Sequence, residues 1–531
     1  MSVSSLPFLH GALAAVLPKL AAWRRDFHAH PEAGWTEFRT AALIIRRLRE
    51  LGYAIRMGEA ACASDRRMGV PSSAVLAAAR ERALEHGADA ELVAGMGDGY
   101  TGFWADLDCG PGPVTAFRFD MDCNEVAECA EESHRPVREG FASRWPGLMH
   151  ACGHDGHAAV GLGLAEVLVS IRRHLRGRIR LIFQPAEEGA RGALPMSEAG
   201  AVDGVDVLFG FHIGFKAEGP GSLICGTQGF LATTKRDVLF SGVPAHAGAA
   251  PEEGKDALLA ACSAVVNLHA ISRNGKGGTR IAVGRLEGGE ARNVIPASAR
   301  LFMETRGETT ELDAYMTAES ERILRASADL WGCACEWRTV GNSAGGGSSP
   351  ELARLIATVA EAMGGWKTVI PMSGFGATED FACLMSRVQA SGGLASYLQV
   401  GTDRAAGHHS DRFDFDETCL GRALELLARL AVRMAGGGQE DTETETESDM
   451  EFLDEVVRRK GIHVQLWLEG EDGEGFGRGR VELLQLVDEL GSLSKAAKQL
   501  GMSYRGAWGK IKKAERIAGE TLVDASGTKR D

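Results

Sequence analysis

The sequence predicts an α/β protein with a mixed, mostly parallel sheet, a smaller α+β domain inserted into it, and a third domain appended at the C-terminus. Strands alternate with helical patterns through the first two hundred residues, which is typical of a largely parallel sheet. Residues 231–340 instead follow the order β-α-β-β-α-β of ferredoxin-like domains. A glycine run at 436–438, followed by an acidic stretch, then breaks the pattern.

The first part of the chain is expected to alternate helices with short apolar strands. Helices are predicted at Thr36–Leu51 and His157–His174, and within a charged, Ala-rich insertion at Gly69–Gly97. Strands are predicted at Val114–Phe119, Arg178–Phe183 and Val205–His212. Ligands of such sheets bind at the carboxyl ends of the strands, so the polar residues that follow these strands are candidates for a site.

The inserted domain is predicted from its change of pattern. Its expected strands and helices are Thr233–Ser241, Asp256–Ile271, Thr279–Gly284, Ala297–Thr305, Leu312–Trp331 and Cys333–Thr339. We expect Gly341–Ser349 to be a flexible linker, after which α/β patterning resumes with a strand at Ser396–Val400. The predicted domains are a first domain in two parts (1–230 and 343–435), the insertion (231–342), an acidic flexible linker (436–450) and a C-terminal domain (451–531).

Composition narrows the class of protein. A net charge of −14 argues against nonspecific nucleic-acid binding by the whole chain. Eleven cysteines without a short-spaced framework suggest reduced thiols, as in the cytoplasm. No apolar run reaches the roughly 18 residues of a membrane span. The N-terminal apolar stretch is interrupted by Pro7, His10 and Pro18, so we expect an amphipathic helix there rather than a signal peptide, and a cytoplasmic protein.

Two motifs carry the chemistry. In the run Met149–His157, Cys152 and His154 stand two residues apart beside a glycine, where thiolate and imidazole can bind one Zn²⁺-like ion. The second motif places Glu187 and Glu188 directly after a predicted strand. Adjacent glutamates can divide the work, one binding metal and one moving a proton. The two motifs together predict a hydrolytic metal site.

Further histidines are expected to complete that site. His212 ends a predicted strand, and the pair His408-His409 follows another. Each would be weak evidence alone, but ligands from several strand-end loops are what a shared metal centre requires. His150 and His157, which flank the first motif, are interpreted as supporting residues rather than ligands.

These motifs resemble the aminoacylase/carboxypeptidase G-type superfamily of metal-dependent amidohydrolases, in the branch with the signature HACGHDxH. Residues 1–435 resemble in particular the p-aminobenzoyl-glutamate hydrolases of that branch. The narrower resemblance rests on Trp23–His28, Gly34–Thr40, Ser133–Pro136, Gly140–Ser143, and Ala406–His409 before Phe413–Glu417.

The resemblance implies a metallopeptidase-like catalytic domain with one or two divalent ions, Mn²⁺ or Zn²⁺. The metal ligands it implies are Cys152, His154, Glu188, His212 and His409. Glu187 matches the general base, and Asp122 matches the acid that orients the metal site. The family's usual apolar Asp-Ala-Leu-Pro is replaced here after Asp122 by Cys123-Asn124-Glu125.

The resemblance also implies that the inserted domain acts as a lid and dimerisation domain. His246 resembles a lid histidine that reaches a partner's active site, and Asn293 and Arg306 resemble lid residues that bind the polar end of the substrate. The alternative is an ordinary turn histidine, turn asparagine and surface arginine. The implied partners are a second copy of the chain and a separate B-type subunit.

Three functions are weighed. The first is hydrolysis of p-aminobenzoyl-glutamate, and the second is the same reaction on another N-acyl amino acid. The third is a transcription regulator whose hydrolase domain has become a ligand sensor. An intact ligand set with Glu187 argues against the third, because a sensor need not keep the base.

The C-terminal domain has helix-turn-helix spacing between Leu490 and Lys513, with Gly501 suited to the turn. It resembles the winged helix-turn-helix domain of molybdate-dependent transcription regulators, chiefly in Met502–Trp508, and a strand is expected at Ile462–Leu468. DNA contacts would come from a polar and basic set on the second helix, and the alternative is a protein-interaction module. That set is Ser503, Tyr504, Arg505, Lys510, Lys512 and Lys513.

Overall fold

The computed structural model describes residues 6–435, 468–469, 475–476 and 495. The chain divides into two compact units, Met1–Phe452 and Leu453–Asp531. In the second unit, β16 (Leu468–Glu469) pairs antiparallel with β17 (Gly475–Phe476). The predicted acidic linker, most of the predicted strand Ile462–Leu468 and the six predicted DNA-contact residues lie outside the described residues.

The first unit is built on a mixed sheet of eight strands in the order β1-β2-β4-β3-β5-β15-β6-β13. Its four central strands, β4, β3, β5 and β15, are parallel, and antiparallel pairs flank them. The strands are β1 (Ala54–Met57), β2 (Phe103–Asp108), β3 (Val114–Asp120), β4 (Arg178–Gln184), β5 (Val207–Glu218), β6 (Ser222–Ile224), β13 (Thr368–Ile370) and β15 (Leu394–Thr402). The mixed α/β sheet predicted from the sequence is confirmed.

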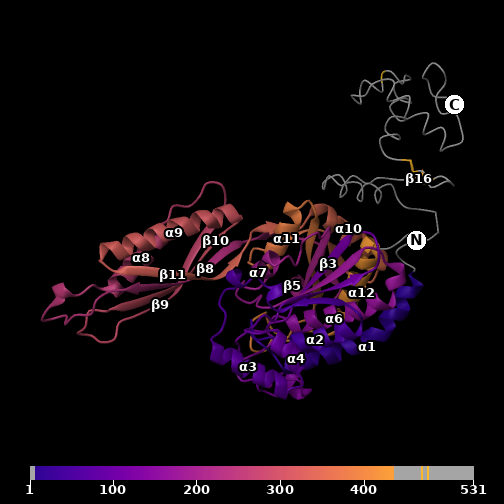
Figure 1. Cartoon of the computed structure of the whole chain (residues 1–531), viewed down its shortest axis with the longest axis horizontal. Coiled ribbons are helices and arrows are strands. Elements are labelled where there is room, and N and C mark those ends of the chain that lie inside the picture. The colour runs from indigo at the N-terminus through magenta and orange to yellow at the C-terminus, as the bar shows by residue number, and fades with distance from the viewer. Residues whose placement is uncertain (1–5, 436–467, 470–474, 477–494, 496–531) are drawn as a thin grey trace. The chain divides into compact units, whose positions relative to one another are not determined.

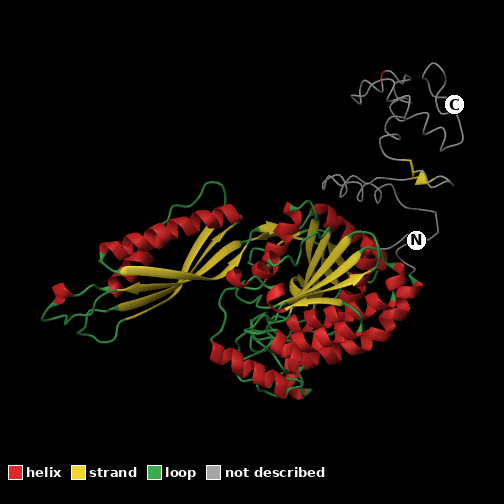
Figure 2. Ribbon diagram, viewed as in Figure 1, coloured by secondary structure: helices red, strands yellow, loops and turns green. Residues whose placement is uncertain are grey.

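Helices cover both faces of this sheet (Figures 1 and 2). On one face, α6 (His154–Ser170) and α12 (Thr418–Ala435) pack against the sheet and α1 (Pro7–Ala29) packs against both helices. On the other face, α11 (Phe381–Ala390) packs against the sheet and α7 (Ala193–Glu198) packs against α11. The remaining helices of this part are α2 (Phe38–Glu50), α3 (Ser73–Glu85), α4 (Ala90–Gly95), α5 (Arg135–Arg138) and α10 (Pro350–Met363). The central strands are buried on both sides, as parallel strands require.

The insertion forms its own sheet of four antiparallel strands in the order β11-β8-β10-β9. Its elements are β8 (Ala232–Ser241), α8 (Ala257–His269), β9 (Thr279–Gly288), β10 (Ser298–Gly307), α9 (Thr310–Leu330) and β11 (Ala334–Ser343). This is the predicted β-α-β-β-α-β order, and Figure 2 shows both helices on one face of the sheet. A separate core fills the space between, with Phe240, Leu301 and Leu324 completely buried.

Three predictions about single elements are wrong. The strand predicted to end at His212 continues to Glu218 as β5, and α6 begins at His154 rather than His157. The predicted linker Gly341–Ser349 is ordered structure. Its first residues belong to β11, Gly346–Gly347 form β12 beside β7 (Thr227–Phe230), and the buried hydroxyl of Ser348 accepts the backbone N–H of Thr227. Composition alone could not predict these ordered contacts, because small residues suit tight packing as well as flexible linkers.

Among the described residues, no helix is both long enough and apolar enough to cross a bilayer.

Candidate metal centre

The residues predicted to bind metal come from different loops and meet at the carboxyl end of the parallel strands. Cys152 lies in the loop before α6, and His154 is the first residue of that helix. Glu188 follows β4, His212 lies within β5, and His409 follows β15. In three overlapping groups the potential ligand atoms lie within 4.8 Å of one another. These groups are Cys152–Glu188–His409, Cys152–His212–His408 and His154–Glu187–Glu188.

The turn between Cys152 and His154, two of the predicted ligands, depends on a glycine. Gly153, which separates Cys152 from His154, has φ +95°, a left-handed conformation that favours glycine. The turn lets the thiol precede the helix while the imidazole starts it, so that both side chains reach the same centre.

His154 is held so that one ring nitrogen stays free. Its Nδ1 lies 2.9 Å from the backbone oxygen of Asp122, and Nδ1–H donates to that carbonyl. The lone pair on Nε2 therefore points away and has no hydrogen-bond partner. The Asp122 carboxylate lies alongside and accepts the backbone N–H of Glu188 at 2.9 Å. Asp122 thus fixes two of the predicted ligands, as expected of an acid that orients the site.

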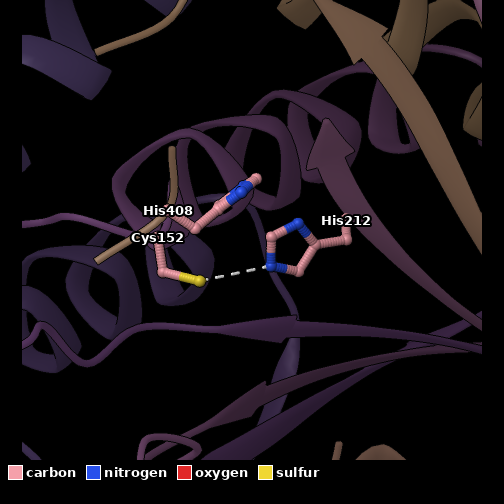
Figure 3. A group of neighbouring side chains, drawn as sticks. All are labelled: Cys152, His212 and His408. Carbon is pink, nitrogen blue, oxygen red and sulfur yellow. Dashed lines mark hydrogen bonds between the residues drawn. The ribbon is translucent and has the colours of Figure 1, made fainter. Parts of the chain in front are cut away.

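Cys152 and His212 face each other with the ring of His408 beside them (Figure 3). Sγ of Cys152 lies 3.5 Å from Nε2 of His212, whose Nδ1–H donates to the oxygen of Ile213 at 2.8 Å. In His408 both nitrogens are engaged, since Nδ1 accepts from Arg404 and Nε2 donates to Ile213. His408 therefore has no free lone pair for a metal ion.

His409 faces Glu188 from the other side. Its Nε2 lies 3.3 Å from Oε1 of Glu188, and more than half of its side chain is exposed. The backbone at His409 has φ +65°, and its N–H donates to the oxygen of Ala151, next to Cys152. Burial disfavours the charged form of Glu188, but the attraction of the neighbouring His409 imidazole outweighs it, so the pKa of Glu188 falls to about 2.

The donor set fits a cation. Nε2 of His154, Oε1 of Glu188 and Oδ1 of Asp122 are buried acceptor atoms without a hydrogen-bond partner. Unsatisfied buried acceptors are costly, and several of them around a thiol and imidazoles are satisfied together by a divalent ion. Burial raises the pKa of the Cys152 thiol, and coordination of a metal is what would release its proton.

Glu187 lies within this site and is mostly buried. Its Oε2 is 3.9 Å from Nε2 of His154, and it also belongs to a buried group with Glu379 and Asp380. Burial raises the pKa of Glu187, and the charges of Glu379, Glu188 and Asp380 raise it further. A carboxyl group with a raised pKa can hold a proton near neutral pH, as a general acid–base catalyst must.

The loop that carries both glutamates is strained and firmly held. Ala186, Gly189 and Ala190 have φ of +49°, +100° and +62°, which is costly for the two alanines. The fully buried Glu37 accepts the N–H of Ala186 at 2.8 Å and the hydroxyl of Thr101 at 2.6 Å. The N–H of Asn342, at the end of β11, donates to the oxygen of Ala190. The loop is thus anchored from both the first domain and the insertion.

Several residues that lie beside the predicted ligands or hold their loops were not predicted from the sequence. They are Glu37, Arg118, Asp120, Asn124, Glu379 and Asp380. Asp120 receives a hydrogen bond from Nδ1 of His157 at 2.5 Å, and the side-chain oxygen of Asn124 accepts the N–H of Ala151 at 3.2 Å. Of these residues, only Glu379 and Asp380 could have been noticed in the sequence, because two adjacent acids before a helix repeat the pattern of Glu187-Glu188.

The three residues predicted in the lid are not brought to this centre. His246 is exposed and accepts backbone N–H groups of Gly248 and Ala249, and its backbone bridges to Val294 beside Asn293. Arg306 pairs with Glu304 at 2.8 Å. Within the described part of the chain, no hydrogen bond or ion pair joins these three residues to the metal ligands.

Two buried histidines predict a loss of stability in acid. Burial lowers the pKa of His150 to about 3 and that of His408 to about 4, the latter with help from Arg404. Both are neutral in the folded protein, whereas in the unfolded chain they gain protons near pH 6.5. Their contribution is therefore present above about pH 6.5 and lost as the pH falls toward 4 and 3.

We expect the thermal unfolding midpoint to fall over this range, and to fall less steeply in His150→Leu, because one of the two titrating groups is gone. Melting curves recorded from neutral to acidic pH measure this. A variant that follows the slope of the parent would refute the assignment of that slope to His150.

The comparisons with known proteins agree with this geometry. The model of "Peptidase family M20/M25/M40" matches residues 116–433, and that of "Bacterial regulatory helix-turn-helix protein, lysR family" matches residues 479–530. The second match confirms the helix-turn-helix prediction, with a different regulator family from the one expected, since the molybdate-regulator resemblance is only loosely matched.

Relatives match the first unit over nearly their whole length. The chain is 46% identical to a protein of Escherichia coli, the A-type component of p-aminobenzoyl-glutamate hydrolase, over 79% of this chain and 96% of the relative. It is 44% identical to indole-3-acetyl-aspartic acid hydrolase of Enterobacter agglomerans, over 80% of this chain and 98% of the relative. The structure of an aminobenzoyl-glutamate utilization protein from Klebsiella pneumoniae superposes with a TM-score of 0.68 at 39% identity. The match covers 80% of this chain and 98% of that protein. A Bacillus subtilis protein described as a dinuclear metal-binding M20 peptidase gives a TM-score of 0.54 at 25% identity, over 79% and 98%.

Proposed function

Because this chain belongs to peptidase family M20/M25/M40 and is a metal-dependent amidohydrolase, we propose that it hydrolyses the amide bond of an N-acyl acidic amino acid. The first substrate we propose is p-aminobenzoyl-glutamate. The observation that carries the proposal is the convergence of unpartnered buried acceptor atoms on His154, Glu188 and Asp122, with the raised-pKa carboxyl of Glu187 beside them.

The proposed ligands are those that the sequence predicts, with Asp122 as the acid that orients them. One or two ions are bound, and the Bacillus subtilis structure of a dinuclear peptidase supports two. A thiolate favours Zn²⁺, whereas the resemblance also allows Mn²⁺. The ligand set is Cys152, His154, Glu188, His212 and His409.

In the proposed mechanism, bound divalent ions supply a Lewis acid and lower the pKa of water. Glu187 accepts a proton from the water that attacks the amide carbonyl, and returns it to the departing amine nitrogen as the C–N bond breaks. The neighbouring acids Glu379 and Asp380 keep its pKa high enough for both transfers. Asp122 holds His154 and the backbone of Glu188 in place throughout.

The substrate proposal rests on what the two relatives have in common. Their names specify a glutamate and an aspartate joined to an aromatic acyl group. Hydrolysis rates for p-aminobenzoyl-glutamate, indole-3-acetyl-aspartate and acyl derivatives of neutral amino acids would test it. We expect acidic amino acids to be preferred, and a preference for neutral ones would contradict the proposal and favour another N-acyl amino acid as substrate.

Asn124 is expected to strengthen metal binding, because it joins two of the ligand loops. Its carbonyl oxygen accepts the N–H of Ala151, next to Cys152, and its side-chain amide helps to lower the pKa of the Glu188 carboxyl. Loss of such an outer contact typically weakens metal affinity about 10–100-fold. We expect Asn124→Leu to release its metal to a chelator at correspondingly lower chelator concentration. Unchanged metal affinity in this variant would show that Asn124 does not support the ligands.

The inserted domain is proposed to serve as a lid and to form a homodimer. His246, Asn293 and Arg306 would then reach the substrate, the histidine from a partner subunit. Exposed apolar side chains on its helices support a second copy as the occupant, since Val266 and Leu330 are each 71% exposed. We expect a dimer in sedimentation experiments and a monomer for the double variant Val266→Lys, Leu330→Lys.

A separate partner protein is supported by the name of the Escherichia coli relative, which describes it as one of the subunits of its hydrolase. Activity measured with and without a B-type subunit would test this, and an increase on its addition is expected.

DNA binding by the C-terminal domain is proposed from the match to a regulatory helix-turn-helix family. Ser503, Tyr504 and Arg505 are proposed to contact DNA together with Lys510, Lys512 and Lys513. We expect the full chain to retard duplex DNA at low salt, with an affinity that falls as salt rises, and the double variant Arg505→Ala, Lys510→Ala to bind more weakly. No retardation at low salt would contradict this part of the proposal.

A further inference from the structure

Just after His212, β5 forms a bulge of four residues, 214–217, before its pairing with β15 resumes. Ile213 pairs with Val400 and Glu218 pairs with Thr402, so residues 214–217 stand opposite Gly401 alone. Gly214 and Phe215 have φ of +73° and +62°. Such a conformation is easy for glycine and unfavourable for a bulky aromatic residue. Lys216 holds the bulge by donating its N–H to Oε1 of Gln399 at 2.8 Å.

The bulge turns Phe215 toward the metal ligands. Its ring lies edge-on to His212, with centroids 5.8 Å apart and planes at 63°, and 5.5 Å from the ring of His408. Behind it, Phe215 stacks on the buried Phe375 at 4.6 Å with planes 26° apart. Phe375 in turn packs on Phe230 and Tyr397. Bulges beside active sites commonly redirect a side chain in this way.

Phe215 itself is only partly buried, so it presents a ring surface backed by a rigid aromatic cluster. A residue that merely made the turn would be glycine, because glycine adopts this conformation without strain. The partly exposed ring of Phe215, beside His212, is available to contact a ligand. An aromatic ring of the substrate suits it, since ring pairs gain from stacking beyond the area they bury. The amino-acid half of the substrate is anionic and gains nothing comparable from an apolar ring.

We propose that Phe215, supported by Phe375, is the wall that binds the aromatic acyl group of the substrate, and that it makes the enzyme selective for aroyl over aliphatic acyl amino acids. This inference rests on the proposed function, which it extends from the amino-acid half of the substrate to the acyl half.

The test compares kcat/KM of the metal-loaded full chain for p-aminobenzoyl-glutamate and for acetyl-glutamate. Phe215→Leu keeps an apolar side chain but loses the ring, and we expect the ratio of the two values to fall roughly tenfold, with little change for acetyl-glutamate. Phe215→Gly, which suits the local backbone, should give the same loss. The matched control is Phe8→Leu, because Phe8 is also half-buried and stacked, on His174, but lies on α1. Its ratio should equal that of the parent.

A second measurement does not depend on turnover. p-Aminobenzoate, the acyl product, should bind the parent chain more tightly than Phe215→Leu in a titration. An unchanged ratio in active enzyme, an equal loss for both substrates, or a loss of bound metal in the variant would overturn the inference. If the parent hydrolyses neither substrate, the proposed function fails. In that case weaker p-aminobenzoate binding in the variant would still support the aromatic wall, and equal or absent binding in both would overturn it.

Discussion

Replacing Glu187 with glutamine is expected to lower kcat about 10²–10⁴-fold while metal binding is retained. The side chain keeps its size, but an amide can neither accept the proton of the attacking water nor return it to the amine. The four groups that lie close to Glu187, which are His154, Glu188, Glu379 and Asp380, stay in place. Steady-state kinetics with p-aminobenzoyl-glutamate, beside metal analysis of the same sample, measures both parts of the prediction.

Glu198→Gln is the control for this variant, because Glu198 is an exposed residue at the end of α7 that pairs with Arg387 across 3.6 Å. Its kinetics should match those of the parent. Full activity in Glu187→Gln would show that another group moves the proton. Loss of metal from that variant would mean that Glu187 is a ligand rather than a base.

The second large effect is expected on stability, from Arg118→Met. Arg118 is fully buried on β3 and neutralises three carboxylates, with its nitrogens 2.5 Å from Asp120, 2.9 Å from Glu379 and 3.3 Å from Asp380. Methionine fills similar space without a charge, so the acids remain buried and unpaired. Breaking a buried ion pair in this way costs about 3–5 kcal/mol, which urea unfolding of the purified chain would register.

Arg338→Met provides the comparison, because this arginine also makes an ion pair, 2.8 Å from Asp237, but is 76% exposed. Exposed pairs contribute about 0–1 kcal/mol, so little change is expected. Equal effects of the two substitutions would contradict the view that Arg118 stabilises the buried acids Glu379 and Asp380 beside Glu187. The same network sets the pKa of Asp380, which burial raises to about 7 in spite of Arg118.

Much of the fold followed from the sequence because its signals are local. The alternation of strands with helices predicted the central sheet, and the β-α-β-β-α-β order of the insertion matches the observed elements to within a few residues. Element ends were harder to predict. The left-handed bulge after His212 keeps β5 in the sheet as far as Glu218, and it depends on Gln399, which is distant in sequence.

The candidate site was predictable to the extent that its proposed ligands belong to compact sequence motifs. Cys152 and His154 lie two residues apart, and Glu187 and Glu188 are adjacent. The groups that orient them could not be found this way, because Glu37 and Arg118 act from separate strands and loops and make sense only once the chain is folded. The sequence around a buried arginine on an apolar strand does not show which distant acids it will pair with in the folded protein.

The roles of the insertion depend on contacts beyond a single first unit. His246 and Arg306 were predicted as substrate-binding residues from the family resemblance. Within the described residues, His246 accepts nearby backbone N–H groups and Arg306 pairs with Glu304. The proposed part of His246 in catalysis requires a second copy of the chain, and the exposed apolar side chains of Val266 and Leu330 are proposed to contact that copy.

The most direct test of the central proposal is to remove metal from the purified chain with a chelator and measure hydrolysis of p-aminobenzoyl-glutamate as Zn²⁺ or Mn²⁺ is returned. We predict no hydrolysis without metal, recovery that saturates at one or two ions per chain, and no recovery in Cys152→Ala, which lacks a ligand shared by two groups of the site. Hydrolysis that persists in the metal-free chain, or recovery in Cys152→Ala equal to that of the parent, would contradict the proposed centre.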